Sequence, residues 1–329
     1  MKKVSVLGSG SWGTALAVML DKYGHDVTIW TRREEAAKAI INDGENKEYL
    51  PGVAINKSIK VLSSKEEAVK NADIIISAIP SRSVRSCLRE FSPMLNENQV
   101  IVNVAKGLEE GTLLRLSQVL KEEVPQCEIC TMVGPSHAEE VARGIPTVCA
   151  VSCDNIETAK MIQKEFSNPN FRLYTNTDTI GMEMGAAIKN VIALAAGVSD
   201  GIGFGDNTKA ALMTRGLAEI TRLGIEMGGK LETFMGLSGI GDLIVTCTSM
   251  HSRNRRAGIL LGQGKKLNEA LEEVHMVVEG VNTAKAVYEF SKRYNVDMPI
   301  IEAVNKVLFE DKDVKEAVME LMMRETKPE

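Results

Sequence analysis

The sequence predicts an α/β protein made of an N-terminal parallel sheet and a second, all-helical C-terminal domain. Three observations support this prediction. Glycines at 8, 10 and 13 directly follow a short apolar run, as where a buried strand turns into a helix. Near-continuous apolar runs recur as far as residue 174, which is typical of strands covered on both faces. From residue 179 onward, helical periodicities rich in glycine and alanine take over.

The glycine turn predicts a Rossmann-type dinucleotide site. Gly8 would allow the tight turn, Gly10 would let a pyrophosphate approach the backbone, and Gly13 would let the helix lie against the strand. A helix reaching Tyr23 and a second strand at Val27–Trp30 complete a strand–helix–strand unit of about 30 residues. The alternative is a glycine turn with a purely structural purpose.

Arg32 and Arg33 follow the second strand, where many NAD-binding proteins carry an acidic residue that holds the ribose hydroxyls. Two arginines suit a 2'-phosphate, because a guanidinium makes paired, charge-assisted hydrogen bonds with phosphate oxygens. We therefore expect NADPH to be accepted, while the preference between NADPH and NADH stays open. The alternative is that both arginines are solvated residues at the start of a helix.

The composition indicates a globular protein of about two domains, because 329 residues with 44% hydrophobic and 25% charged residues are close to average. A net charge of -5 argues against a nucleic-acid-binding surface spread over the molecule. The glycines of the turn interrupt the apolar core that a secretory signal would need, and the most apolar helix, predicted at 186–198, is shorter than a membrane span. We expect a cytoplasmic protein.

Six cysteines lie at positions 87, 127, 130, 149, 153 and 247. Cys127-x-x-Cys130 is the one pair whose spacing suggests a metal site. It falls on a predicted strand at 128–133, where residues three apart face opposite sides of the sheet. We therefore expect reduced structural thiols and no metal.

Further apolar runs predict the rest of the sheet. Those runs cover 73–79, 100–104, 129–133, 148–151 and 171–174. A helix that Asp154 caps and that reaches Phe166 is predicted between the last two. Ligands bind beyond the carboxyl ends of parallel strands, and Lys106 stands just past one such end. An ordinary loop lysine is the alternative.

The domain boundary is placed near Asp178, which gives a dinucleotide-binding domain at 1–178 and a helical substrate domain at 179–329. Helices are predicted at 210–227, 268–273, 284–294 and 300–309, with glycine-rich loops at 197–205 and 236–241. The charged tail at 324–329 is expected to fray. The apolar helical half predicts a homodimer.

Three polar clusters in the helical half need an explanation, since buried polar groups are costly unless they are paired. They are Lys189-Asn190, the segment 239–247 that contains Asp242, and the segment 251–256. Taken singly, each has an ordinary interpretation: a lysine whose stem lies on apolar surface, a capping aspartate and a solvated basic loop.

Taken together with the glycine turn, these clusters resemble the NAD(P)-dependent glycerol-3-phosphate dehydrogenases over most of the chain. The matching motifs are Gly-Ser-Gly-Ser-Trp-Gly at 8–13, Ala-Lys-Gly at 105–107, Gly-Pro-Ser at 134–136, Gly-Ala-Ala-Ile-Lys-Asn at 185–190, Gly-Asp-Leu at 241–243, Ser-Arg-Asn-Arg-Arg at 252–256 and Val-Glu-Gly-Val-Asn-Thr at 278–283. The resemblance implies reversible hydride transfer between NAD(P)H and dihydroxyacetone phosphate, which would give sn-glycerol 3-phosphate for phospholipid synthesis.

The resemblance also implies roles for individual residues. Lys189 would be the proton donor and acceptor, and Arg253 with Asn254 would grip the substrate phosphate. The implied substrate site consists of Lys106, Gly134, Ser136, Lys189, Asp242, Ser252, Arg253 and Asn254. The implied cofactor site includes the glycine turn and consists of Gly8, Gly10, Ser11, Trp12, Gly13, Arg32, Arg33, Lys106, Ala138, Arg253, Val277 and Glu279. His137 departs from the aromatic residue often found after this Gly-Pro-Ser, so its role is left open.

The residue types suit this chemistry independently of the resemblance. Reduction of a ketone places negative charge on the carbonyl oxygen, which a nearby cation stabilises and then protonates. A free lysine with a pKa of ~10.4 is a sluggish acid, and burial beside a second cation would lower that pKa. Arginine suits the phosphate because its guanidinium presents a planar fork of donors.

Two other functions stay open at this point. A related two-domain dehydrogenase would act on a hydroxy acid without a phosphate grip, or on a sugar nucleotide with Cys247 as the candidate nucleophile. A catalytically silent NAD(P)-binding regulator would have no need of Lys189, Asp242 and Arg253, and all three are present.

Overall fold

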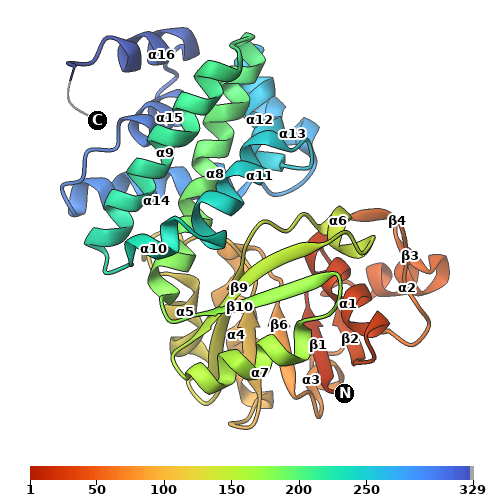
Figure 1. Cartoon of the computed structure of the whole chain (residues 1–329). Coiled ribbons are helices and arrows are strands. Elements are labelled where there is room, and N and C mark those ends of the chain that lie inside the picture. The colour runs from red at the N-terminus through yellow and green to blue at the C-terminus, as the bar shows by residue number, and fades with distance from the viewer. Residues whose placement is uncertain (327–329) are drawn as a thin grey trace.

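The computed structural model describes residues 1–326, so the end of the tail that was predicted to fray, 327–329, lies outside the described residues. An eight-stranded sheet with helices on both faces forms the N-terminal half, and the C-terminal half is helical throughout its described part (Figure 1). The predicted fold class is therefore confirmed. The boundary near Asp178 stays a prediction, although one long helix does begin at the next residue.

The main sheet is parallel except at one edge. Its strands are β1 (Lys3–Leu7), β2 (Asp26–Trp30), β5 (Lys60–Leu62), β6 (Ile74–Ser77), β7 (Val100–Asn103), β8 (Glu128–Val133), β9 (Thr147–Cys153) and β10 (Phe171–Asn176). They lie in the order β10-β9-β8-β7-β6-β1-β2-β5. Pairs from β5 to β8 are parallel, whereas β9 is antiparallel to β8 and parallel to β10. Apolar runs predicted these strands except β5, which lies in a mixed, polar part of the sequence, and they did not predict the reversal of the last two strands.

Two layers of helices cover the sheet, which explains why its central strands are apolar at every position. Ile74 and Ile76 of β6 pack into the core on one face, and Ile75 packs into the core on the other. One layer contains α1 (Ser11–Lys22), α2 (Glu34–Asp43), α6 (Ala138–Ala142) and α7 (Ile156–Phe166). The opposite layer contains α3 (Lys65–Val69), α4 (Val84–Phe91) and α5 (Leu116–Glu123). Cys127 and Cys130 fall in these two different cores, as a strand requires.

Smaller elements complete the N-terminal half and include one correction. They are the hairpin β3 (Glu45–Asn46) and β4 (Leu50–Ala54) and the 3-10 turns η1 (Ser81–Ser83) and η2 (Ser92–Met94). The prediction that Asp154 caps α7 is wrong. The Asn155 side chain accepts the Glu157 amide hydrogen at 3.1 Å, while the Asp154 carboxylate pairs with Lys121. Asn and Asp are about equally good caps, so the sequence alone could not choose between these neighbours.

The helical half is organised around α8. Its elements are α8 (Thr179–Ile202), α9 (Asp206–Glu226), α10 (Leu231–Phe234), the π-helical turn η3 (Leu237–Gly241), α11 (Asp242–Thr248), α12 (Arg253–Gly262), α13 (Leu267–Val274), α14 (Glu279–Arg293), α15 (Pro299–Phe309) and α16 (Val314–Met322). The predicted loop at 236–241 is largely η3. The Asp178 carboxylate caps α8 by accepting the Gly181 amide hydrogen at 2.8 Å.

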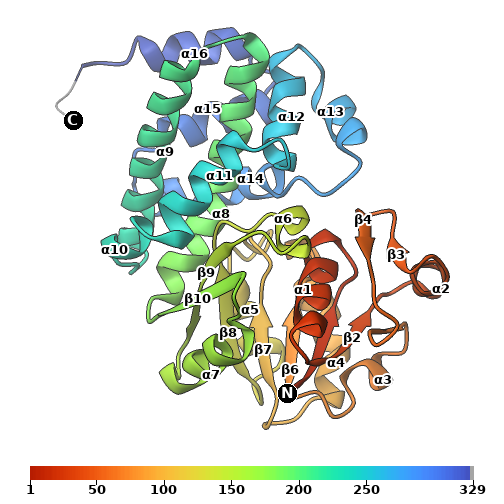
Figure 2. The ribbon, with the colours of Figure 1, turned by 45° about the vertical axis from the view of Figure 1, so that its right-hand side comes forward.

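Helix α8 is longer than the sequence suggested. It has 24 residues, and an 18-residue window has a mean hydropathy of 1.2, so length and composition alone would allow it to cross a membrane. Within the structure, 89% of that window is buried, as expected for the central helix of a domain core. Figure 2 shows α8 rising from the sheet into the helical half, with the other helices grouped around it.

Gly197 and Gly201 suggested a loop in the sequence, but both lie within α8 and serve helix packing. The predicted loop at 197–205 is wrong for 197–202, since α8 continues to Ile202 and only 203–205 connect it to α9. A Cβ atom on Gly197 would lie 2.1 Å from the carbonyl oxygen of Arg255, and one on Gly258 would lie 2.1 Å from that of Leu194. The two glycines therefore let the backbones of α8 and α12 touch, which brings the N-terminus of α12 against the middle of α8.

Candidate functional site

The glycine turn between β1 and α1 has the geometry that an anion site requires. Gly8 has a φ of 113°, and a Cβ atom there would lie 2.7 Å from the Ala78 carbonyl oxygen. A Cβ atom on Gly13 would lie 2.1 Å from the Gly8 carbonyl oxygen, whereas one on Gly10 would meet nothing within 4 Å. Helix α1 has no side-chain cap, so no capping side chain occupies its first amide groups. These features fit the pyrophosphate of a dinucleotide.

A buried side chain that the sequence did not reveal holds this turn in place. The Asn46 amide donates hydrogen bonds to the Ser9 carbonyl oxygen at 2.7 Å and to the Thr14 hydroxyl at 2.9 Å. Nothing near Asn46 in the sequence marks it, because its partners precede it by more than 30 residues. Ser11 is buried, and Trp12 is half-buried against the small core beneath β4.

The two arginines after β2 differ in their surroundings. Both are exposed. The Arg33 guanidinium forms an ion pair with Glu48, at 2.9 Å from Nη2 to Oε2. Arg32 has no hydrogen bond or ion pair with any described residue. Arg32 is therefore the arginine of this pair that is free to bind a ligand.

Three charged side chains from distant segments meet where the two halves join. Lys106 follows β7, Lys189 lies in α8, and Asp242 is the first residue of α11. The Lys106 ammonium lies 2.8 Å from Asp242 Oδ2, and the Lys189 ammonium lies 2.9 Å from Asp242 Oδ1. One carboxylate therefore holds both cations.

Burial gives this lysine cluster unusual electrostatics. Lys189 is 3% exposed and Asp242 is 1% exposed. The pKa of Lys189 is lowered to about 8, because burial and, less strongly, the charge of Lys106 outweigh the opposing effect of Asp242. Burial alone would raise the pKa of Asp242, but Lys106 and Lys189 together hold it below its ordinary value. Lys189 is thus a stronger acid than a solvated lysine and stays mostly protonated at neutral pH.

Thr246 belongs to the cluster and was missed. Its hydroxyl accepts a hydrogen bond from the Lys189 ammonium at 2.5 Å and donates one to the Asp242 backbone carbonyl at 2.6 Å. Its spacing of four residues from Asp242 would place both on one face of a helix, but the apolar neighbours at 243–245 and 247 hide the helical periodicity in the sequence. Cys247, next along, is fully buried, and burial raises the pKa of its thiol to about 12. That thiol is therefore not a nucleophile at neutral pH.

The Gly-Pro-Ser turn after β8 lies beside Lys106. The Gly134 carbonyl oxygen accepts hydrogen bonds from the Lys106 ammonium at 2.9 Å and from the Ser136 hydroxyl at 3.0 Å. His137 is close enough to the cluster for both lysines to act on it. Burial first, and then Lys189 and Lys106, lower the pKa of His137, so its imidazole is neutral at pH 7.

The N-terminus of α12 carries Arg253, a candidate anion-binding residue. The Ser252 hydroxyl caps α12 by accepting the Arg255 amide hydrogen at 3.2 Å. Arg253 is half-buried and, within the described part of the chain, has no hydrogen bond or ion pair. Burial lowers the pKa of Arg253, and the charge of Glu279 acts most strongly against that effect. A half-buried guanidinium without a partner is suited to bind an anion.

Asn254 is less available than the resemblance implied. Its amide nitrogen donates to Asn190 Oδ1 at 2.9 Å, and its amide oxygen accepts the Gly280 amide hydrogen at 2.8 Å. Asn254 thus ties α12 to α8 and α14. The structure gives it a role in holding the helices together, and its contact with a phosphate stays a prediction.

The remaining cofactor-site residues lie at helix starts. Ala138 is the buried first residue of α6, and Val277 is half-buried just before α14. The Glu279 carboxylate, at the start of α14, accepts hydrogen bonds from the Ser81 backbone amide at 3.2 Å and from the Ser81 hydroxyl at 2.6 Å. Ser81 lies just past β6, so this pair also joins the two halves, and sequence reasoning did not single it out.

Comparisons with known proteins agree with this arrangement. The family descriptions "NAD-dependent glycerol-3-phosphate dehydrogenase N-terminus" and "C-terminus" match residues 3–159 and 178–319. A protein of Fusobacterium nucleatum named glycerol-3-phosphate dehydrogenase [NAD(P)+] is 54% identical over 331 residues, covering 100% of this chain and 99% of the relative. One of the same name from Bacillus licheniformis is 55% identical, covering 98% and 95%. A crystal structure of glycerol-3-phosphate dehydrogenase from Coxiella burnetii is 35% identical, covers 98% and 99%, and has a TM-score of 0.95.

Proposed function

The chain belongs to the NAD-dependent glycerol-3-phosphate dehydrogenase family, and from that premise we propose that Lys189 transfers the proton as dihydroxyacetone phosphate and sn-glycerol 3-phosphate interconvert. Membership makes the protein an oxidoreductase that uses NAD(P)H. One observation supports the role of Lys189 above the others: a buried ammonium, anchored by Asp242, with a pKa of about 8.

Lys189 stabilises and then protonates the alkoxide that forms as the ketone is reduced. A lysine with a pKa near 8 gives up its proton more readily than a solvated lysine and is still charged at neutral pH. In the reverse direction the neutral amine accepts the hydroxyl proton. Asp242 and Thr246 fix the ammonium, and Lys106, on the other carboxylate oxygen, adds a second positive charge close to the substrate oxygens.

Arg253 holds the substrate phosphate. Its guanidinium is half-buried without a partner among the described side chains, so an arriving phosphate would replace water rather than an ion pair. Ser136 and the backbone at Gly134 complete the substrate site beside Lys106. Ser252 acts mainly by capping the helix that carries Arg253.

The residues of the N-terminal half fit a nicotinamide dinucleotide. The bound cofactor supplies or accepts the hydride. The uncapped start of α1 binds the pyrophosphate, and the space in front of Gly10 lets it approach. Arg32 binds a 2'-phosphate when the dinucleotide is NADPH. Glu279, at the start of α14, lies close to Arg253.

The biological setting belongs to the same proposal. The product would be the backbone for phospholipids, the protein would act in the cytoplasm, and it would be a homodimer formed through its helical half. The burial of α8 supports a protein whose most apolar helix lies in a core rather than in a bilayer.

A direct assay tests the proposed function. Protein is mixed with NADPH or NADH, and the absorbance of the reduced nicotinamide is followed after dihydroxyacetone phosphate is added. Absorbance should fall, and unphosphorylated dihydroxyacetone should be a poor substrate because phosphate binding orients the carbonyl. Arg253→Ala should raise the KM for dihydroxyacetone phosphate steeply, whereas Arg293→Ala, an exposed arginine of the same half, should not. If the wild type used dihydroxyacetone nearly as well, the phosphate site would be wrong.

A further inference from the structure

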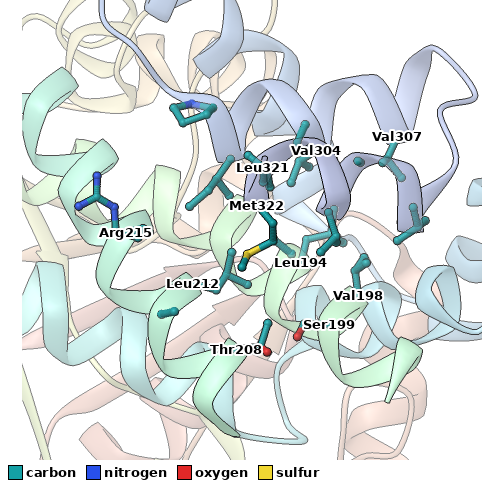
Figure 3. A pocket seen from close by; sticks show the side chains of 18 of the residues that line it. Leu194, Val198, Ser199, Thr208, Leu212, Arg215, Val304, Val307, Leu321 and Met322 are labelled. Atoms are coloured by element: carbon teal, nitrogen blue, oxygen red, sulfur yellow. The ribbon is translucent and has the colours of Figure 1, made fainter. Parts of the chain in front are cut away.

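A cavity lies in the helical half, away from the lysine cluster. It has a volume of about 340 Å³ and is bounded by α8, α9, α15 and α16. Leu194, Leu212, Val304 and Leu321 are among the apolar side chains that face it (Figure 3). Leu194 and Val198 follow Lys189 by five and nine residues, so at 100° per residue they lie roughly 140° and 180° around α8 from it. The cavity and the lysine cluster thus use opposite faces of the same helix.

The size and lining of this cavity suit a flexible apolar chain. Natural ligand sites start at about 300 Å³, and an apolar cavity of about 150 Å³ already binds benzene. The 340 Å³ space is therefore large enough for a hydrocarbon chain of roughly ten carbons. Its lining is mainly aliphatic, with the hydroxyl residues Ser199 and Thr208 on one side, so such a chain would be buried mostly against apolar side chains.

One edge of the cavity carries a positive charge that no described residue compensates. Arg215 of α9 is half-buried, and Figure 3 shows it at the margin of the apolar side chains. Among the described residues it has no hydrogen bond or ion pair. Arg222 lies about two helical turns further along α9. Its Nε atom is also buried without a partner among the described residues, although its Nη2 donates to the Asp297 carbonyl oxygen at 2.8 Å.

The acidic groups near this edge are already engaged or exposed. The Glu219 carboxylate accepts the amide hydrogens of Ile300 and Ile301 at 2.8 and 3.2 Å, and burial raises its pKa to about 7. Arg324 forms an ion pair with Asp297 at 3.0 Å, and Glu325 is exposed at the end of the described chain. Arg222 and Arg324 have partners near this edge, so Arg215 is the arginine there that is placed to bind an anion.

We propose that this cavity binds a straight-chain carboxylate of about ten carbons, with its chain between α8, α15 and α16 and its carboxylate on Arg215. The nearby α16 supplies an entrance. Ala317 is its one buried residue, while Met319 and Met322 are 63% and 77% exposed. A helix held by so few buried side chains opens at low free-energy cost, which lets a ligand reach a cavity that α16 covers.

Titration of the full-length protein with decanoate tests this site. Isothermal titration calorimetry is run below the concentration at which decanoate forms micelles, with saturating NADPH so that the nucleotide site is filled. Saturable binding is expected. Decanol should bind at least tenfold more weakly, because it has the same chain without the charge.

Variants then test separately the contribution of the Arg215 charge and that of the cavity to binding. Arg215→Gln should weaken decanoate at least tenfold and leave decanol unchanged, whereas Arg293→Gln, an exposed arginine on α14, should alter neither. Ala303→Phe should abolish binding of both by filling the cavity, with turnover of dihydroxyacetone phosphate unchanged. If that variant unfolds, the Arg215→Gln comparison still decides the matter.

Several results would overturn the proposal. They are the absence of saturable decanoate binding, equal affinity for decanol, or displacement of decanoate by dihydroxyacetone phosphate. Sedimentation of the same samples identifies one other occupant. If Ala303→Phe dissociates a dimer and the wild type does not bind decanoate, a second copy of this chain covers the cavity instead.

Discussion

The glycine turn and the lysine cluster hold charge in different ways. The turn offers no charged side chain: unpaired amide groups at the start of α1 and close backbone packing around Gly8 and Gly13 prepare it for an anion. The cluster contains three charges, two of them buried and that of Lys106 half-buried, and each lies within 3 Å of an opposite charge. We therefore expect substitutions that add atoms to impair the glycine turn, and substitutions that remove a charge to impair the lysine cluster.

The largest effect is expected from removing the shared carboxylate. Asp242→Asn leaves the Lys106 and Lys189 ammonium groups without their counter-charge, one of them fully buried. Breaking a buried pair from one side typically costs about 3–5 kcal/mol, so urea unfolding at pH 7 should show a loss of that order, together with loss of activity. Asp154→Asn removes an exposed partner of Lys121 and should change the unfolding free energy little. Equal losses in both variants would show that burial of the cluster is not what matters.

A smaller effect distinguishes the two arginines after β2. Arg32→Gln should weaken NADPH by about 1.5–3 kcal/mol, the usual worth of a hydrogen bond to a charged group, and should spare NADH. Arg33→Gln should cost less, because Glu48 already engages that guanidinium. Dissociation constants from fluorescence titration of both variants with both nucleotides measure the difference. A loss of NADH affinity as large as that of NADPH would refute the assignment to the 2'-phosphate.

The smallest effect on stability separates two glycines of the same motif. Gly13→Ala places a Cβ atom 2.1 Å from a backbone oxygen and should lower the unfolding free energy by about 1–3 kcal/mol. Gly10→Ala meets nothing within 4 Å and should leave thermal stability almost unchanged, yet it should still weaken nucleotide binding by occupying the space of the pyrophosphate. If Gly10→Ala bound NADPH normally, the turn would not approach the pyrophosphate as we describe.

The turn was predictable because its information is local. Strand, glycine spacing and helix follow one another within residues 4–22, and each glycine has a steric reason that spacing alone conveys. The lysine cluster is different, since Lys106 and Asp242 are 136 residues apart and Glu279 lies 198 residues from Ser81. Periodicity says nothing about contacts over such distances, so those residue types were recognised through resemblance to a family.

Elsewhere the sequence misled because one residue type serves several purposes. Glycine usually marks a loop, but Gly197 and Gly201 lie within α8, where a Cβ atom would lie 2.1 and 2.2 Å from backbone oxygens of the neighbouring α12. Likewise Asn254 is polar and near Arg253, yet its amide is occupied by Asn190 and Gly280. Which partner a glycine or amide meets depends on the tertiary packing.

The role of Lys189 as proton donor is tested most directly by the pH dependence of the reaction. We compare kcat and kcat/KM for dihydroxyacetone phosphate in the wild type and in Lys189→Met. In the wild type, kcat/KM for reduction should fall as pH rises through about 8, because the ammonium then loses its proton. Lys189→Met keeps much of the side-chain length and should lower kcat by roughly 10²- to 10⁴-fold, remove that pH limb and bind NADPH almost normally. A variant with substantially intact kcat and the same fall near pH 8 would contradict the account, and Lys106 would become the next candidate.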